Sequence, residues 1–298
     1  MAQEAVSETT PAAAERRRFF WRRRTLLSLL AVLALALLAL WLQRERIADD
    51  LIGRELAARG IEATYEIERI GGSHQVLRNI VVGDPERPSL TIVRAEVIIR
   101  YRFGWPEIGR IRLTSPRLYG TWIDGELSFG AFDPLIFTEG EEPFEFPNFA
   151  LDLHDGRALL ETDHGPVGVR LAGEGHLRGG FAGELAATAP ELALDGCEVA
   201  GATLFGAIGI DAERPRFKGP LRLQSLDCGD SVQLTQATLN ADARFDRDLA
   251  GVEGTLAGET RAARLAEAAA DALLLQSRFS FRGGELTASY EIEGEGLA

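Results

Sequence analysis

Recognisable catalytic motifs are absent from this chain of 298 residues. It has no H-E-x-x-H signature, no G-x-S-x-G nucleophile elbow and no P-loop. The four histidines form no tight ligand pair; they are His74, His154, His164 and His176. We therefore expect surface histidines rather than a metal site. The sequence predicts no catalytic residues, no metal and no cofactor, and favours a protein that is not an enzyme.

Positive charge is scarce beyond the first 24 residues. Six of the 32 basic residues and three of the 45 acidic residues lie in 1–24, so the remainder has 26 basic and 42 acidic residues, a balance of −16. Proteins bind phosphate backbones with clustered lysine and arginine. The composition therefore argues against nucleic acid as a partner.

One long hydrophobic run lies near the N-terminus. Residues 25–42 carry no charge, and a helix of this length rises about 27 Å, close to the hydrocarbon thickness of a bilayer. A cleaved signal peptide is the alternative, but no small-residue cleavage site follows Trp41-Leu42, which favours an uncleaved signal anchor. The six preceding arginines favour a cytoplasmic N-terminus. We therefore predict a single-pass protein of the bacterial inner membrane, with its bulk in the periplasm.

Most of the remaining chain alternates apolar and polar residues with the period of β-strands. In Leu90–Phe103 the odd positions are largely apolar and several even positions are arginine or glutamate, which predicts a strand with one apolar face and one wet face. Dipeptides such as Asp124-Gly125 and Asp195-Gly196 favour tight hairpins. Long helical crossovers are missing, so we expect a mainly β protein with an antiparallel sheet and a few short helices.

The predicted organisation has six parts. They are a basic cytoplasmic tail (1–24), the transmembrane anchor (25–42), a juxtamembrane helix (43–60), a first β subdomain (61–135), a Pro/Glu-rich connector (136–148) and a continuing β region (149–298). Three prolines between 133 and 148 argue against a central strand at the connector. Within the last part, residues 259–276 are rich in alanine and leucine and lack glycine and proline, which predicts a helical insertion.

Only two cysteines are present, Cys197 and Cys228. Their spacing is not that of a C-x-x-C redox pair. Outside the cytoplasm an even pair is usually oxidised, so we predict a disulfide that ties neighbouring strands, with free thiols as the alternative. Similar short segments precede both cysteines, which suggests a repeated strand unit and an elongated array.

Several segments resemble a known family. The anchor and short helix, followed by Leu77-Arg78-Asn79-Ile80 and by the strand–proline–strand pattern of Ile111–Leu118, resemble the start of AsmA-like and TamB-like envelope proteins. The glycine-rich stretch Leu151–Pro190 is more similar to the YdbH branch. The resemblance implies a long, curved β-groove that carries phospholipid between the inner and outer membranes. Because such proteins are usually longer, it also implies that this chain is an N-terminal portion.

If the resemblance holds, the apolar faces of the strands would line a lipid groove. The predicted lining residues are Val93, Ala95, Val97, Ile99, Tyr101, Ile111, Leu113, Leu286, Tyr290 and Ile292. An ordinary sandwich core explains their periodicity equally well, since alternation reports burial and not what covers the side chains.

The expected partners are phospholipid and the inner membrane, with outer-membrane or periplasmic proteins as further candidates. The alternative function is a structural or assembly protein of the envelope that conducts no lipid. An anchored periplasmic enzyme is the weakest alternative.

Overall fold

The computed structural model describes residues 61–102, 105–133, 145–265 and 268–296. All of them belong to one unit, Gly53–Ala298. The predicted anchor (25–42) and juxtamembrane helix (43–60) lie outside the described residues, as does most of the predicted connector. None of the helical segments described is long and apolar enough to cross a bilayer.

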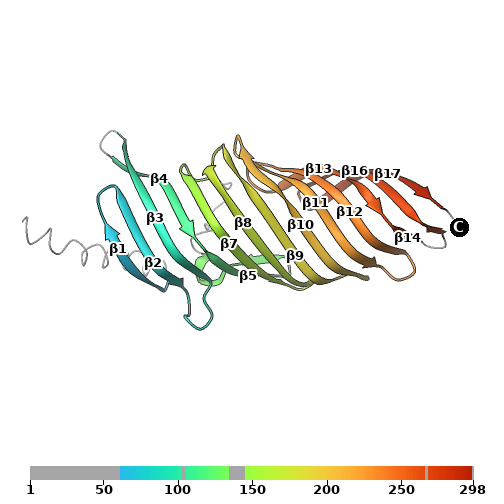
Figure 1. The fold of residues 1–298 in the computed structure, drawn as a ribbon, viewed down its shortest axis with the longest axis horizontal. Coiled ribbons are helices and arrows are strands. Elements are labelled where there is room, and N and C mark those ends of the chain that lie inside the picture. The colour runs from blue at the N-terminus through green and yellow to red at the C-terminus, as the bar shows by residue number, and fades with distance from the viewer. Residues whose placement is uncertain (1–60, 103–104, 134–144, 266–267, 297–298) are drawn as a thin grey trace, which may run out of the picture. The chain divides into compact units, whose positions relative to one another are not determined.

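The described chain is almost entirely β-strand (Figure 1). The elements are β1 (Ala63–Ile70), β2 (His74–Val82), β3 (Leu90–Arg102), β4 (Trp105–Thr114), β5 (Arg117–Ile123), β6 (Glu126–Ser128), the 3-10 helix η1 (Gly130–Phe132), β7 (Ala150–Thr162), β8 (Gly165–His176), β9 (Phe181–Leu194), β10 (Cys197–Asp211), β11 (Arg214–Asp227), β12 (Val232–Phe245), β13 (Gly251–Thr260), β14 (Ala262–Leu265), β15 (Ala268–Ala270), β16 (Ala272–Arg282) and β17 (Glu285–Glu295).

These strands form one large, curved sheet. Its hydrogen-bonded order follows the chain from β1 to β3, continues through β4 and β5 to β7, and then runs from β8 to β13, β16 and β17. The short β14–β15 hairpin extends the sheet beside β12, and β6 pairs with β5. Within the described residues, β1 and β17 each pair on one side only, so the sheet has two edges.

Nearly all neighbouring strands are antiparallel, as predicted, but β7 runs parallel to both β4 and β5. Together β4 and β5 act as one bent strand, because Ser115 has φ 50° and Pro116 lacks a backbone donor. Asp155 (φ 51°) lies opposite this bend, and its carbonyl oxygen accepts a hydrogen bond of 2.9 Å from Arg117. A parallel pair needs a crossover, and residues 129–149, which include η1, supply it.

The helix predicted over 259–276 is wrong. Its residues complete β13 and form β14, β15 and the start of β16. Alanine and leucine favour helix locally, but here β13 and β17 offer full ladders of backbone partners on both sides of β16. Long-range pairing therefore outweighs the helix propensity. The only helical element in the described part of the chain is η1.

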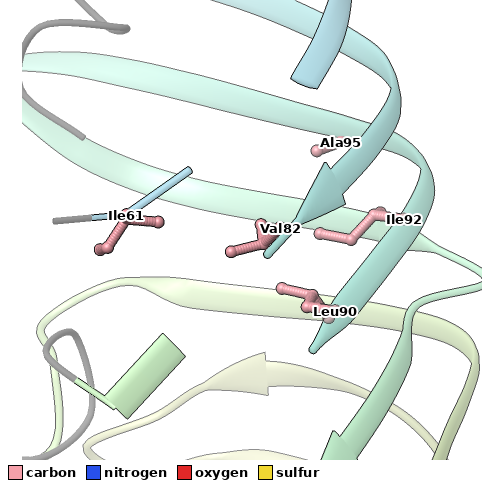
Figure 2. Close-up of a cluster of buried hydrophobic side chains, with 5 residues drawn as sticks. All are labelled: Ile61, Val82, Leu90, Ile92 and Ala95. Carbon is pink, nitrogen blue, oxygen red and sulfur yellow. The ribbon is translucent and has the colours of Figure 1, made fainter. Parts of the chain in front are cut away.

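Tightly buried residues gather in small clusters rather than in one central core. One cluster joins Val82 at the end of β2 to Leu90, Ile92 and Ala95 of β3 and to Ile61, which precedes β1 (Figure 2). Ala131 and Phe132 of η1 pack against this cluster. A second cluster gathers around Phe146, while two more consist of strand residues alone. The strands therefore form essentially one layer.

Candidate functional site

Strand register assigns side chains to the two faces of the sheet, because directly paired residues point to the same side. Following the pairs from β1 to β17 gives a first apolar row with one residue from each main strand. It consists of Ile67, Leu77, Ala95, Leu113, Leu153, Gly173, Gly183, Ile208, Phe217, Ala243, Gly254, Phe279 and Ala288. None of these residues has a polar side chain.

A second apolar row crosses the sheet beside the first. It consists of Ala63, Val82, Leu90, Leu118, Ala158, Val169, Ala187, Leu204, Leu221, Leu239, Gly258, Leu275 and Ile292. Leu90 and Ala95 share one buried cluster, so the two rows lie on the same side of the sheet. We call this side the apolar face. Its two rows run without a polar side chain from one edge strand to the other.

The opposite side is the polar face. The row that flanks the first apolar row on that side is rich in charge: it includes Glu96, Arg112, Asp152, Glu174, Arg216, Arg244 and Glu253. A sheet with one apolar face has to cover that face with another layer or with a ligand. The difference between the faces therefore identifies the apolar face as the candidate functional site.

Glycines on the apolar face allow the sheet to curl toward that face. A Cβ at Gly206 would lie 2.3 Å from the carbonyl oxygen of Lys218, and one at Gly219 would lie 2.1 Å from that of Phe205. The backbone of each neighbouring strand thus bends over the apolar face. Gly173 and Gly183 show the same close approach in β8–β9, and Gly258 shows it in β12–β13. The hairpins β8–β9, β10–β11 and β12–β13 are therefore bent toward the apolar face at these glycines.

Coverage of the apolar face changes along the sheet. In the first strands Val82, Leu90 and Ala95 are buried. From β8 onward most members of the two rows are half-buried, and in β17 every residue is exposed. Leu286, Tyr290 and Ile292 keep 66%, 71% and 45% of their surface accessible. The end of the apolar face near β17 thus offers large side chains that the described chain leaves uncovered.

The structure brings most of the predicted lining residues to this face. Ala95 pairs with Leu113, and Val97 pairs with Ile111, so all four share it. Leu286, Tyr290 and Ile292 lie opposite apolar-face residues of β16; their partners are Phe281, Ser277 and Leu275. Whether these side chains contact lipid stays a prediction.

The predicted alternation is interrupted in β3. Ile92 and Ala95 enter the same cluster although they are three positions apart, and Val93 between them is 56% exposed. The two apolar rows are spaced by five residues in β2, β3, β4–β5 and β7, and by four in β8 and β9. Asn79, Ser115 and Asp155, all with φ near 50°, mark the extra residues. This line of bulges removes Val93 from the apolar face.

Ile99 and Tyr101 lie near the β3–β4 turn. The register between β3 and β4 shifts between Ile98 and Ile99, at the position where Gly109 of β4 has no partner in β3. The side chain of Arg100 packs across Gly109, and a Cβ added there would lie 2.6 Å from it. The Tyr101 hydroxyl donates a hydrogen bond of 2.6 Å to the carbonyl oxygen of Gly72 in the β1–β2 turn. Tyr101 therefore ties two hairpin ends together, and its contact with lipid stays a prediction.

Two carboxylates are buried on the polar face beneath arginines. Arg112 donates a hydrogen bond of 2.6 Å to the carboxylate of Glu96 and one of 3.3 Å to that of Asp152. Arg94 forms a further ion pair with Glu96, and Arg110 forms one with Asp152. Burial opposes the ionisation of Glu96, but Arg94 and Arg112 outweigh it and lower its pKa. The hydrogen bond from Arg110 is the main cause that lowers the pKa of Asp152. The network holds β3, β4 and β7 together.

Cys197 and Cys228 form a disulfide with an S–S length of 2.03 Å, which confirms the predicted pairing. They join the start of β10 to the residue that directly follows β11, next to the register pair Glu198 and Asp227. In the part of the chain that the structure describes, no group of three or more His, Cys, Asp or Glu side chains could hold a metal ion.

Sequence comparison supplies the family. A family model described as YdbH-like, intermembrane phospholipid transport protein YdbH, matches residues 32–298. The chain belongs to the YdbH-like family. The description is that of a transport family and names no enzymatic activity. None of the curated proteins matches the chain.

Membership of the YdbH-like family connects the fold with the resemblance found in the sequence. The match includes all strands from β1 to β17. Reasoning from the sequence missed the largest part of the apolar face, the residues contributed by β8 to β13. The signal was present as alternation in Val167–Leu177 and Ala200–Ile210, but glycines at several positions weakened it.

Proposed function

We propose that this chain is an inner-membrane-anchored periplasmic protein that carries phospholipid between the inner and outer membranes, with acyl chains lying on the apolar face. The observation that supports this most is the pair of apolar rows, which cross the whole sheet without a polar side chain. Phospholipid transport is also what the family description names. Single-pass anchoring by residues 25–42 and periplasmic location are parts of the proposal.

Elementary energetics makes the arrangement suitable for transport. An acyl chain on the apolar face stays out of water, at about 0.8 kcal/mol for each CH₂ group kept buried. The rows run across the strands, so a lipid that moves along them meets apolar side chains or glycine, and no polar side chain, at every step. The headgroup can remain in water at the rim of the sheet. Transport of this kind needs no catalytic residue.

A structural or assembly role without lipid conduction is the second candidate. The open edge of β17 favours it, because the backbone groups on that side have no strand partner among the described residues and can pair with a strand of another protein. This role does not require the apolar face to bind lipid.

Lipid transfer between vesicles tests the proposal. Donor vesicles carry the full chain and fluorescent phosphatidylethanolamine, and acceptor vesicles contain neither. We expect the full chain to accelerate the transfer of the labelled lipid several-fold over protein-free donors. Equal rates with and without the protein would contradict lipid transport and leave the assembly role. Protease treatment of intact spheroplasts tests location, since a periplasmic bulk is digested and a cytoplasmic one is protected.

A further inference from the structure

We infer that acyl chains occupy the apolar face only from β11 to β17, because the protein's own side chains close the opposite end, over β1 to β10. This inference rests on the proposed function and adds where on the sheet lipid binds. It depends on how the apolar face is covered along its length.

The first closing group lies over β2, β3 and β5. Ile61, Ala131 and Phe132 come from outside the sheet and pack on the residues of the first cluster. The backbone N–H of Ala131 donates a hydrogen bond of 3.1 Å to the hydroxyl of Ser89, which fixes η1 beside β3. Leu90, Ile92 and Ala95 beneath this group are all buried. The apolar face is therefore already covered here.

Phe146 closes the next section. It lies at the end of the crossover, just before β7, is itself buried, and packs on Phe181 of β9 and Ile210 of β10. Arg178, in the β8–β9 turn, holds this residue in place: its Nε donates a hydrogen bond of 2.8 Å to the carbonyl oxygen of Phe146. The same guanidinium lies 3.3 Å from the carboxylate of Glu145 and 3.6 Å from that of Glu213.

Beyond these groups, the coverage ends. The other two buried clusters consist of residues from strands of the sheet, so no described side chain from outside the sheet lies over β11 to β17 in them. Exposure rises toward the edge, where Phe281 and Leu286 are 41% and 66% exposed. A lipid gains burial of its CH₂ groups on an uncovered apolar surface, whereas over β1 to β10 it would have to displace packed side chains. The uncovered section is therefore where binding is favourable.

Photocrosslinking along the two rows tests this inference. The full chain is placed in vesicles of radiolabelled phosphatidylethanolamine and phosphatidylglycerol, with p-benzoylphenylalanine at one position in each variant. Leu239 and Phe279 represent the open section, and Leu90 and Leu113 represent the closed section of the same two rows. Gln276 on the polar face is the control. We expect lipid adducts at Leu239 and Phe279 at least fivefold above those at the other three positions.

Each outcome has a distinct meaning. Equal adducts at Leu90 and Leu239 would overturn the inference and leave the proposed function standing. Absence of adducts at all apolar positions would contradict the proposed function and, with it, the inference. Because a bulky probe at a buried leucine can disturb folding, a second variant gives an independent test. Phe146→Ala should raise the adducts formed at Ile208, and unchanged labelling there would overturn the closing role of Phe146.

Discussion

At the scale of single residues, the polar face contains the strongest local constraints. Glu96 and Asp152 retain only 6% and 3% of their surface accessible, yet both are held in the ionised form by the arginines above them. The even-numbered charges of β3 were predicted to lie on a wet face, and they do lie opposite the apolar rows. That two carboxylates would be buried there could not be predicted, because it depends on β7 arriving beside β4 through the parallel pairing.

This network predicts how stability depends on pH. The pKa values of Glu96 and Asp152 are lowered in the folded chain, so both groups stabilise the fold above their unfolded pKa values of about 4. This contribution is lost as the pH falls through the lowered, folded values. We expect the melting temperature to be steady between pH 7 and 5 and to fall below pH 4, as measured by circular dichroism.

A substitution of Asp152 distinguishes the contribution of this network from that of other carboxyl groups that titrate at low pH. Asp152→Asn should lower the free energy of unfolding at pH 7 by about 1.5–3 kcal/mol, since hydrogen bonds to charged groups contribute on that order. The substitution should also make the fall of the melting temperature below pH 4 less steep. Asp242→Asn is the matched control, because its ion pair with Lys218 is exposed on the same face and contributes little. Equal effects of the two substitutions in urea titrations would contradict the assignment.

At the scale of elements, the strand pattern predicted the fold well where alternation was strong, as in β3, β4 and β17. It failed where local composition and long-range pairing disagree. Residues 259–276 have the composition of a helix but form strands, because β13 and β17 satisfy the backbone of β16 on both sides. The bulge that removes Val93 from the apolar face was equally invisible, since the left-handed residues Asn79 and Ser115 are not glycines.

The close approach of backbone to glycines in the hairpins gives the prediction at this scale. Gly219→Val places a side chain on the apolar face where the carbonyl oxygen of Phe205 would lie 2.1 Å from the new Cβ. We expect a loss of about 1–3 kcal/mol in the free energy of unfolding, as is typical of overpacking. Gly168→Val in β8 is the matched control, because the nearest atom, the Thr188 methyl carbon, is 3.5 Å from its Cβ, an ordinary contact. Equal losses for both variants in urea denaturation would show that the bends at these glycines are not required.

At the scale of the whole molecule, the described chain is one sheet with unlike faces. The sequence predicted a mainly β protein and the disulfide between Cys197 and Cys228, and the family followed from the resemblance. It could not predict that residues of thirteen strands align into two rows without a polar side chain, because alignment depends on register. A one-residue slip in any hairpin would move a polar side chain into the rows.

The alignment of these rows leads to the central claim, that acyl chains lie on the apolar face. The adjacent residues Leu275 and Gln276 of β16 point to opposite faces, the first within the second apolar row. Replacing each by arginine introduces the same charged side chain on the two sides. Leu275→Arg should fold, because its side chain faces an uncovered section rather than a sealed core, where a charge would unfold the chain.

The most direct measurement is the amount of phospholipid that copurifies with the full chain, quantified by mass spectrometry for the unmodified chain and for both variants. We predict that the unmodified chain and Gln276→Arg retain similar amounts of phospholipid and that Leu275→Arg loses most of it while keeping its circular dichroism spectrum. Equal phospholipid in all three proteins, or none in the unmodified chain, would contradict the account.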